Sequence, residues 1–146
     1  VQAKLDYITE DGADYDRLCL LNLTTQTGFC GRVVQDVVTK PVRKWARAQG
    51  RDGGAEWRCG FELGKDTFTP DGGEPTVISK TRPDDFVREL RHIEDTLESK
   101  SGKTSPISLE RGLDTMLVVA AAHRSQAEGR TVRIDRAAGF GPNALI

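Results

Sequence analysis

The chain has 146 residues, which is the size of one domain with enough apolar residues for a buried core. Its formal net charge of −1 gives no general attraction to nucleic acid or to anionic lipid. No apolar run reaches the roughly 18 residues that a membrane span needs. These features argue against a nucleic-acid-binding protein and against a membrane protein.

The three cysteines favour a reduced protein. Cys19, Cys30 and Cys59 are odd in number and lack Cys-x-x-Cys spacing. This pattern is typical of a cytoplasmic chain without a structural zinc site. Because the chain begins with Val1, we expect it to be a processed or excised piece of a longer protein.

The first part of the chain predicts strands. Residues 1–7 alternate between apolar and polar, as in a strand with one wet face. Residues 18–23 are apolar on both faces, and residues 29–39 are rich in β-branched side chains. A turn at residues 11–14 separates the first two of these segments.

Two further segments predict a β-hairpin. Residues 42–49 and 55–61 flank the glycine-rich sequence 50–54, which is a strong turn signal. If Gln49 pairs with Gly54, opposite charges meet across the strands, and small residues face large ones. The expected pairs are Arg47 with Glu56, Trp45 with Arg58, Ala46 with Trp57, and Ala48 with Ala55.

A turn at residues 68–73 and a strand at residues 75–81 precede the first predicted helix. Thr81 and Asp84 form a capping-box-like start. An apolar stripe then follows at helical spacing, made by Phe86, Leu90, Ile93 and Leu97.

The second helix is predicted to begin with Ser105 as N-cap and Pro106 in the first turn, and to stop at Gly129. A strand at 131–135 and an irregular tail at 136–146 follow. The expected fold is α+β, with a mainly antiparallel open sheet of six or seven strands and two helices packed on one face. Residues 1–135 would form this domain.

Two helices cover only one face of such a sheet. We therefore expect a second copy or a partner domain to bury the other face, which makes a homo-oligomer the expected state. The residues behind this expectation are Leu21, Leu23, Val34 and Val38.

Three motifs in the second half resemble the carboxy-terminal domain of the glucose–fructose oxidoreductase / inositol dehydrogenase / rhizopine-catabolism family (Gfo/Idh/MocA). They are Asp85-Phe86-Val87-x-Glu89-Leu90, Ser105-Pro106-Ile107-Ser108-Leu109-Glu110-x-Gly112-Leu113, and Ala120-Ala121-x-x-x-Ser125-x-x-x-Gly129-Arg130-x-Val132. The resemblance implies an amino-terminal Rossmann domain for NAD or NADP in a full-length protein. It also implies a sheet-rich second domain that shapes the pocket for a sugar, a polyol or a related substrate and oligomerises through its open sheet face.

The residues that carry hydride chemistry in that family are missing. The nearest match to a dinucleotide loop, Gly139-Phe140-Gly141-Pro142, lacks the third glycine and lies in the tail. The family's Glu-Lys-Pro is reduced to Thr39-Lys40-Pro41, and neither His92 nor His123 has an aspartate four residues before it. We therefore expect no catalytic, cofactor-binding or metal-binding residue here, and no turnover by this chain alone.

Two basic segments are candidates for contacts with a small-molecule substrate. The hairpin edge around Lys44, Trp45 and Arg47 suits an acidic or phosphorylated sugar or an acidic partner, or is a solvated face with cross-strand ion pairs. Lys80 and Arg82 lie where a strand leads into a helix, and they contact a ligand or form a helix-entry charge pair. His123 is expected to be a packed histidine and His92 a solvated one.

Two hypotheses of different classes follow. In the first, the chain is the substrate-binding and oligomerisation domain of an NAD(P)-dependent oxidoreductase. In the second, it is a stand-alone homo-oligomeric ligand-binding or structural domain without redox activity.

Overall fold

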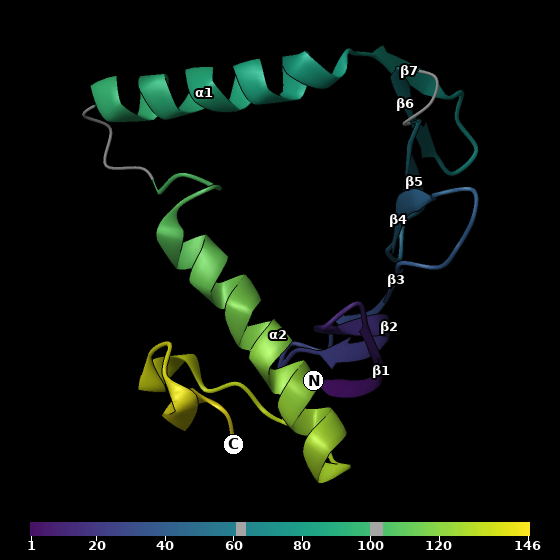
Figure 1. The fold of residues 1–146 in the computed structure, drawn as a ribbon. Helices are drawn as coiled ribbons and strands as arrows, with labels where there is room; N and C mark the ends of the chain where they lie inside the picture. Colours follow the sequence, from purple (N-terminus) through teal and green to yellow (C-terminus); the bar gives the residue numbers. More distant parts are fainter. Residues whose placement is uncertain (61–63, 100–103) are drawn as a thin grey trace. The chain divides into compact units, whose positions relative to one another are not determined.

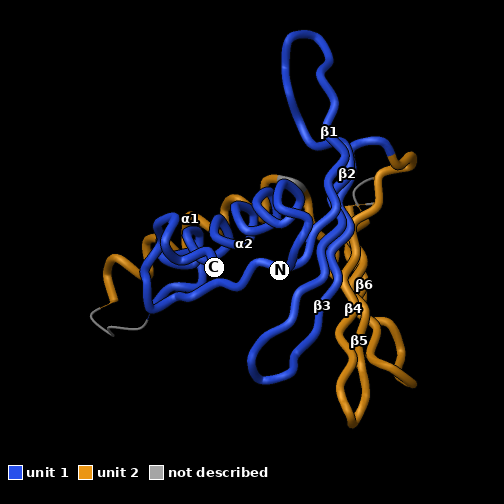
Figure 2. Tube along the Cα trace, turned by 90° about the horizontal axis from the view of Figure 1, so that it is seen from below, with its two compact units in different colours: residues 1–38, 104–146 blue, residues 39–103 orange. Residues whose placement is uncertain are grey.

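The computed structural model describes residues 1–60, 64–99 and 104–146 (Figure 1). Within these residues, seven strands form two antiparallel sheets, and two α-helices follow the strands in the sequence. This confirms the predicted α+β class and the antiparallel strands, which form two open sheets where the sequence predicted one. The chain divides into unit 1, residues 1–38 with 104–146, and unit 2, residues 39–103 (Figure 2).

The sheet of unit 1 has the strand order β1-β2-β3. The strands are β1 (Gln2–Glu10), β2 (Ala13–Thr24) and β3 (Cys30–Asp36). The predicted first turn is confirmed, because Asp11 and Gly12 connect β1 to β2 with φ angles of 52° and 78°. Positive φ at both central residues gives the turn a twist that matches the flanking strands.

One face of this sheet is covered by helix α2 (Leu109–Glu128), which packs on β1. Ala3, Leu5, Cys19, Leu21 and Leu23 share that face, as their cross-strand pairing requires. Their burial decreases from Leu5, which is 4% exposed, toward β3, where Val33 is 40% exposed. Leu21 and Leu23 thus belong to the covered face.

The second face of this sheet is mixed rather than apolar. Lys4, Leu20 and Val34 lie in one cross-strand row, and Gln2, Asn22 and Arg32 lie in the next. Val34 is exposed, and so is Val38, which follows the end of β3. The apolar second face expected from the sequence is therefore broken by charged and amide side chains in this sheet.

Helix α2 begins later than predicted. Its N-cap is Ser108, whose Oγ accepts a hydrogen bond from the Arg111 N–H at 3.4 Å. Ser105 instead accepts the Ser108 N–H through its carbonyl oxygen at 3.1 Å, so residues 105–108 form a turn before the helix. The predicted stop is confirmed: Gly129 adopts the left-handed conformation, with φ 65°, that favours glycine at a helix end.

The core of unit 1 joins distant parts of the sequence. Helix α2 presents small side chains to β1, which allows the two backbones to approach closely. Residues near the C-terminus complete the core, with the 3₁₀ helices η1 (Arg136–Ala138) and η2 (Pro142–Ala144) in the segment predicted as irregular. The buried hydrophobic residues are Leu5, Leu117, Ala121, Ala122, Val132 and Ala144.

Polar side chains of α2 also satisfy the free edge of β1. Ser125 Oγ accepts the Ala3 N–H at 3.0 Å, and Gln126 Oε1 accepts the Leu5 N–H at 3.0 Å. Buried backbone donors need such partners, because an unpaired one costs about as much as a lost hydrogen bond. Ser125 Oγ in turn donates to the Arg130 carbonyl oxygen at 2.6 Å, which ties the helix end to the same edge.

The strand predicted at residues 131–135 is reduced to single backbone pairings. The Val132 N–H donates to the Val1 carbonyl oxygen at 2.8 Å, and the Val1 ammonium group donates to the Val132 carbonyl oxygen at 2.7 Å. Further along, Ile134 forms an isolated bridge with Leu145. The segment therefore extends the β1 edge by one residue before it turns away.

Unit 2 contains a meander of four strands in the order β4-β5-β6-β7. The hairpin of β4 (Lys44–Gln49) and β5 (Gly54–Cys59) has the predicted register, with Trp45 opposite Arg58. Strand β6 (Lys65–Pro70) was not predicted, and the turn expected at residues 68–73 begins only after Pro70. Strand β7 (Thr76–Ser79) is shorter than the predicted segment.

Helix α1 (Arg82–Glu98) follows β7 and starts with the predicted capping box. The Thr81 N–H donates to Asp84 Oδ2 at 2.6 Å. The predicted apolar stripe is exposed, from 41% at Ile93 to 81% at Leu97. No helix in the described part of the chain has both the length and the apolar composition needed to cross a membrane.

Candidate functional site

The sheet of unit 2 separates its side chains into two chemically different faces. Residues that pair across antiparallel strands point to the same face, so the register assigns each side chain. The polar face is formed by Trp45, Arg47, Glu56, Arg58, Thr67, Thr69 and Val77. The other face, which we call the apolar face, carries Ala46, Ala48, Ala55, Trp57, Phe68 and Ile78, together with Lys44, Asp66 and Thr76.

The polar face contains a shallow groove of about 450 Å³. Two arginines, two carboxylates and two threonine hydroxyls supply most of its lining. Pairing across the face balances the charges: Arg47 lies 3.5 Å from Asp71, and Arg58 forms an ion pair with Glu56. The lining residues are Arg47, Glu56, Arg58, Thr67, Thr69, Asp71 and Pro75.

Trp45 adds an aromatic surface to the same face. It pairs with Arg58 across β4 and β5 and is 60% exposed. An exposed indole offers apolar contact area, while guanidinium, carboxylate and hydroxyl groups both donate and accept hydrogen bonds. Ligands with hydroxyls and C–H faces fit this combination better than anions, because each arginine already has a carboxylate beside it.

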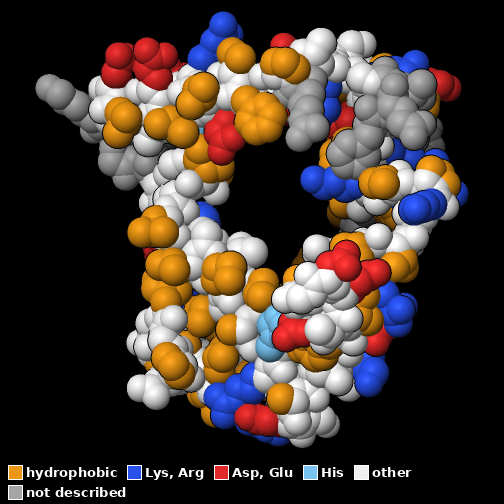
Figure 3. Space-filling view, in the orientation of Figure 1, with side chains coloured by type: hydrophobic (Ala, Val, Ile, Leu, Met, Phe, Trp, Pro, Cys, Tyr) orange, Lys and Arg blue, Asp and Glu red, His pale blue; other side chains and the backbone are white. Residues whose placement is uncertain are grey.

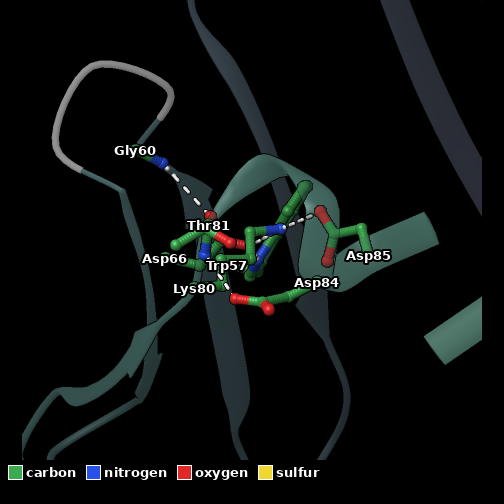
Figure 4. A network of polar contacts seen from close by, with 7 residues as sticks. All are labelled: Trp57, Gly60, Asp66, Lys80, Thr81, Asp84 and Asp85. Carbon is green, nitrogen blue, oxygen red and sulfur yellow. Dashed lines mark hydrogen bonds and ion pairs between the residues drawn. The ribbon is translucent and has the colours of Figure 1, made fainter. Parts of the chain in front are cut away.

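A second polar cluster lies at the start of helix α1 (Figure 4). The buried Asp66 carboxylate accepts hydrogen bonds from Trp57 Nε1 at 3.1 Å and from the Gly60 N–H at 3.3 Å. Lys80 Nζ lies 3.1 Å from Asp66 Oδ2 and donates to Asp85 Oδ2 at 2.8 Å. We call Trp57, Gly60, Asp66, Lys80 and Asp85 the Asp66 cluster.

The Asp66 cluster favours charged side chains. Burial alone raises the pKa of Asp66, but hydrogen bonds from Lys80, the Gly60 N–H, Trp57 and Cys59 outweigh it, so the net pKa lies below its usual value. Hydrogen bonds to Asp85 and Asp66 raise the pKa of Lys80. Both groups stay ionised at neutral pH, and the cluster joins β5, β6 and β7 to the start of α1.

The five predicted substrate-binding residues do not come together at one place. Trp45 and Arg47 lie on the polar face, and Arg47 lines the groove. Lys44 lies on the other face, where its Nζ is 5.9 Å from the centroid of the Trp57 ring. Lys80 forms the helix-entry charge pair, which was the alternative interpretation. The backbone of Arg82 begins α1, but its side chain lies outside the described part of the structure.

Sequence reasoning missed most of the groove lining. Glu56 and Arg58 were present in the predicted hairpin register, so the alternation of β5 was a usable signal for them. Thr67, Thr69 and Asp71 depend on β6, which the sequence did not predict. Their places beside β5 follow only from the strand pairing of the folded sheet.

The two histidines belong to helices and are not among the residues that line the groove. His123 is exposed rather than packed in the core, and its ring stacks on Tyr7 with centroids 5.7 Å apart. Its Nδ1 lies 2.7 Å from the Tyr7 hydroxyl. His92 is half-buried. Within residues 1–60, 64–99 and 104–146, no three His, Cys, Asp or Glu side chains are grouped to hold a metal ion.

Comparisons of the chain with protein-family models, with curated proteins and with solved structures found no match. The resemblance to the Gfo/Idh/MocA carboxy-terminal domain stays a prediction from three motifs. In the structure these motifs lie in α1, around the start of α2, and across the end of α2. They include Ser108 and Gly129, so part of their pattern reflects helix capping.

Proposed function

We propose that this chain binds a neutral sugar, polyol or related compound on the polar face of unit 2. It would act as the substrate-binding and self-association domain of an NAD(P)-dependent oxidoreductase. The observation that carries the proposal is the charge-balanced groove of about 450 Å³ on the same face as the exposed Trp45. Clefts with a few convergent polar groups and an aromatic surface are common ligand sites.

The groove chemistry supports a neutral ligand over an acidic one. Arg47 and Arg58 each have a carboxylate partner, so a ligand phosphate would compete with Asp71 and Glu56 for the same guanidinium groups. A hydroxyl group needs no such exchange, because it accepts from a guanidinium while it donates to a carboxylate.

The apolar face supports self-association. Phe68 and Ile78 are 43% and 39% exposed, and the described residues of unit 2 contain no buried hydrophobic side chain. A sheet normally buries one apolar face against another element. A second copy offers the same face, so the two related by a two-fold axis are complementary by symmetry.

The hydride chemistry would come from a separate nucleotide-binding domain. The glycine pair at residues 139–141 connects η1 and η2, whereas a pyrophosphate loop lies between a strand and a helix. In a calorimetric titration with NAD or NADP, we therefore expect no heat of specific binding. Micromolar binding of either dinucleotide would contradict the proposal that a separate domain binds the nucleotide.

Titration with a panel of hexoses and polyols, with matched sugar acids and sugar phosphates, tests the proposal. We expect neutral compounds to change the fluorescence of Trp45, and a Trp45→Phe variant to assign the signal, since Trp57 is the second tryptophan. Arg58→Gln should weaken binding about tenfold or more, because it removes a guanidinium from the groove. The control Arg51→Gln lies in the hairpin loop outside the groove lining.

The outcome that would reject the proposal is also clear. Binding of acidic compounds without binding of neutral ones would show that the ion pairs open to admit an anion. No binding of any compound by a folded chain would leave the polar face as a solvated surface with ion pairs.

A further inference from the structure

Helix α1 carries an apolar surface that its own unit leaves exposed. The stripe consists of Phe86, Leu90, Ile93 and Leu97, and its last three residues line a shallow groove of about 520 Å³. In Figure 3, which keeps the view of Figure 1, hydrophobic side chains gather along this helix. The groove is lined by Val87, Leu90, Arg91, Ile93, Glu94, Leu97 and Glu98.

The stripe has the spacing of a coiled-coil seam. Its residues follow one another at intervals of four, three and four, which is the alternation of d and a positions in a heptad. Val87 and Glu94 then flank the seam at e positions, and Glu89 and Thr96 flank it at g positions. The charges at these four flanking positions determine whether a parallel or an antiparallel second helix brings like charges together.

The geometry points to an antiparallel pairing of α1 with α1 of a second copy of this chain. In a parallel pair, each g residue faces the e residue five positions later in its partner, so Glu89 would meet Glu94 twice. In an antiparallel pair, e faces e and g faces g. Glu94 then meets Val87, and Glu89 meets Thr96, without a like-charge contact.

The antiparallel register also uses the whole stripe. Phe86 meets Leu97 of the second copy, and Leu90 meets Ile93, so all four apolar residues face apolar partners. Antiparallel helices in addition place opposite ends of their dipoles side by side. A partner helix without this pattern would lose the apolar match along the stripe.

The attachment of α1 leaves the stripe accessible. The capping box at Thr81 and Asp84 and the ion pair of Lys80 with Asp85 hold its first turn, and the four stripe residues are exposed. The 17-residue helix is about 25 Å long, and two heptads give weak pairing by themselves. The pairing of α1 is independent of ligand binding in the groove on the polar face of the sheet. It also uses residues other than those of the apolar sheet face.

Matched double variants test the use of the stripe in analytical ultracentrifugation. We expect Leu90→Gln with Ile93→Gln to raise the dissociation constant of self-association about tenfold or more. The control, Arg88→Gln with Asp95→Gln, introduces the same residues on the opposite side of the helix and leaves the net charge unchanged. Circular dichroism checks that both variants keep their helix. Equal self-association of the two, or a wild-type chain that stays monomeric at high concentration, would overturn the pairing.

Cysteine trapping tests the orientation. Glu89→Cys with Thr96→Cys should form a disulfide between copies, since these positions meet in the antiparallel pair. Within one helix they are about 10 Å apart along the axis, beyond the roughly 7 Å that a disulfide spans. Phe86→Cys is the parallel indicator, because its two copies are about 16 Å apart along an antiparallel pair. Peptide mapping that found the Phe86→Cys chains joined to each other at this position, and no bond between positions 89 and 96, would overturn the orientation.

Discussion

Units 1 and 2 differ in which side chains they bury. All six buried hydrophobic residues of the described chain belong to unit 1, where residues near both ends of the chain meet α2. In the described part of unit 2, the one buried side chain is the carboxylate of Asp66. Unit 1 therefore depends on packing between distant segments, whereas unit 2 depends on neighbouring hairpins and a polar cluster.

This difference indicates where the chain can interact with other molecules. Burial of apolar area is the dominant favourable term in folding, so unit 1 is expected to be the stable part. In unit 2 the apolar face and the stripe of α1 are exposed and open to a partner. The comparison predicts that changes in unit 1 act on folding, and that most changes in unit 2 act on binding.

The largest expected effect is the loss of a core side chain in unit 1. Leu117→Ala should lower the free energy of unfolding by about 2–5 kcal/mol, because it leaves a cavity beneath α2. The matched control is Leu109→Ala in the same helix, where the side chain is 79% exposed and little should change. Urea unfolding followed by circular dichroism measures both. Equal effects would remove the basis for calling unit 1 the packed unit.

The next effect concerns the polar cluster of unit 2. Asp66→Ala should lower the free energy of unfolding by about 1–3 kcal/mol, because it leaves the Trp57 and Gly60 donors without their acceptor. Tryptophan fluorescence during urea unfolding reports on this cluster through Trp57. Asp85→Asn, at a more exposed carboxylate, is the control and should cost less. If Asp66→Ala left the free energy of unfolding unchanged, the Asp66 cluster would not be what stabilises this unit.

The same cluster should make unit 2 sensitive to acid. The folded-state pKa of Asp66 is depressed, so its contribution is fully present above the unfolded pKa and is lost as the pH falls through the folded pKa. Acid unfolding followed by Trp57 fluorescence should therefore steepen below about pH 4. Asp66→Asn should flatten this part of the profile, and an unchanged profile would count against the assignment.

The smallest expected effect tests the boundary of α2 in unit 1. Ser108→Ala should lower the free energy of unfolding by about 1 kcal/mol, because the helix loses its N-cap acceptor. Ser108→Asp should restore most of this loss, since an aspartate caps equally well and favours the positive end of the helix dipole. Thermal unfolding resolves the difference. An unchanged free energy of unfolding in the alanine variant would favour the predicted N-cap at Ser105.

Local signals predicted the parts of the fold that local chemistry determines. The glycine-rich turn defined the hairpin register, and Thr81 with Asp84 defined the start of α1. The start of α2 was placed at Ser105, because Ser-Pro before an apolar run has the same pattern as the cap that Ser108 provides. The strand β6 was hidden by Pro70 and the glycines after it, which favour a turn.

The remaining features depend on long-range pairing that the sequence does not reveal. The chain forms two sheets because β3 pairs with β2, and β4 pairs with β5. The alternation of residues within a strand does not indicate which strand will be its neighbour. The groove was missed for the same reason, since Thr67 and Thr69 join Arg58 only through the pairing of β5 with β6. Of the predicted contact residues whose side chains the structure describes, Arg47 alone lines the groove.

The side chains of Ser125 and Gln126 on the edge of β1 also limit how the sheet of unit 1 can grow. Their hydrogen bonds occupy the N–H groups of Ala3 and Leu5, so a new strand cannot pair along that half of β1. The order β1-β2-β3 leaves β3 as the other border. Two molecules joined along their β3 borders would carry these capped β1 edges on both outer sides, which disfavours further strand addition there.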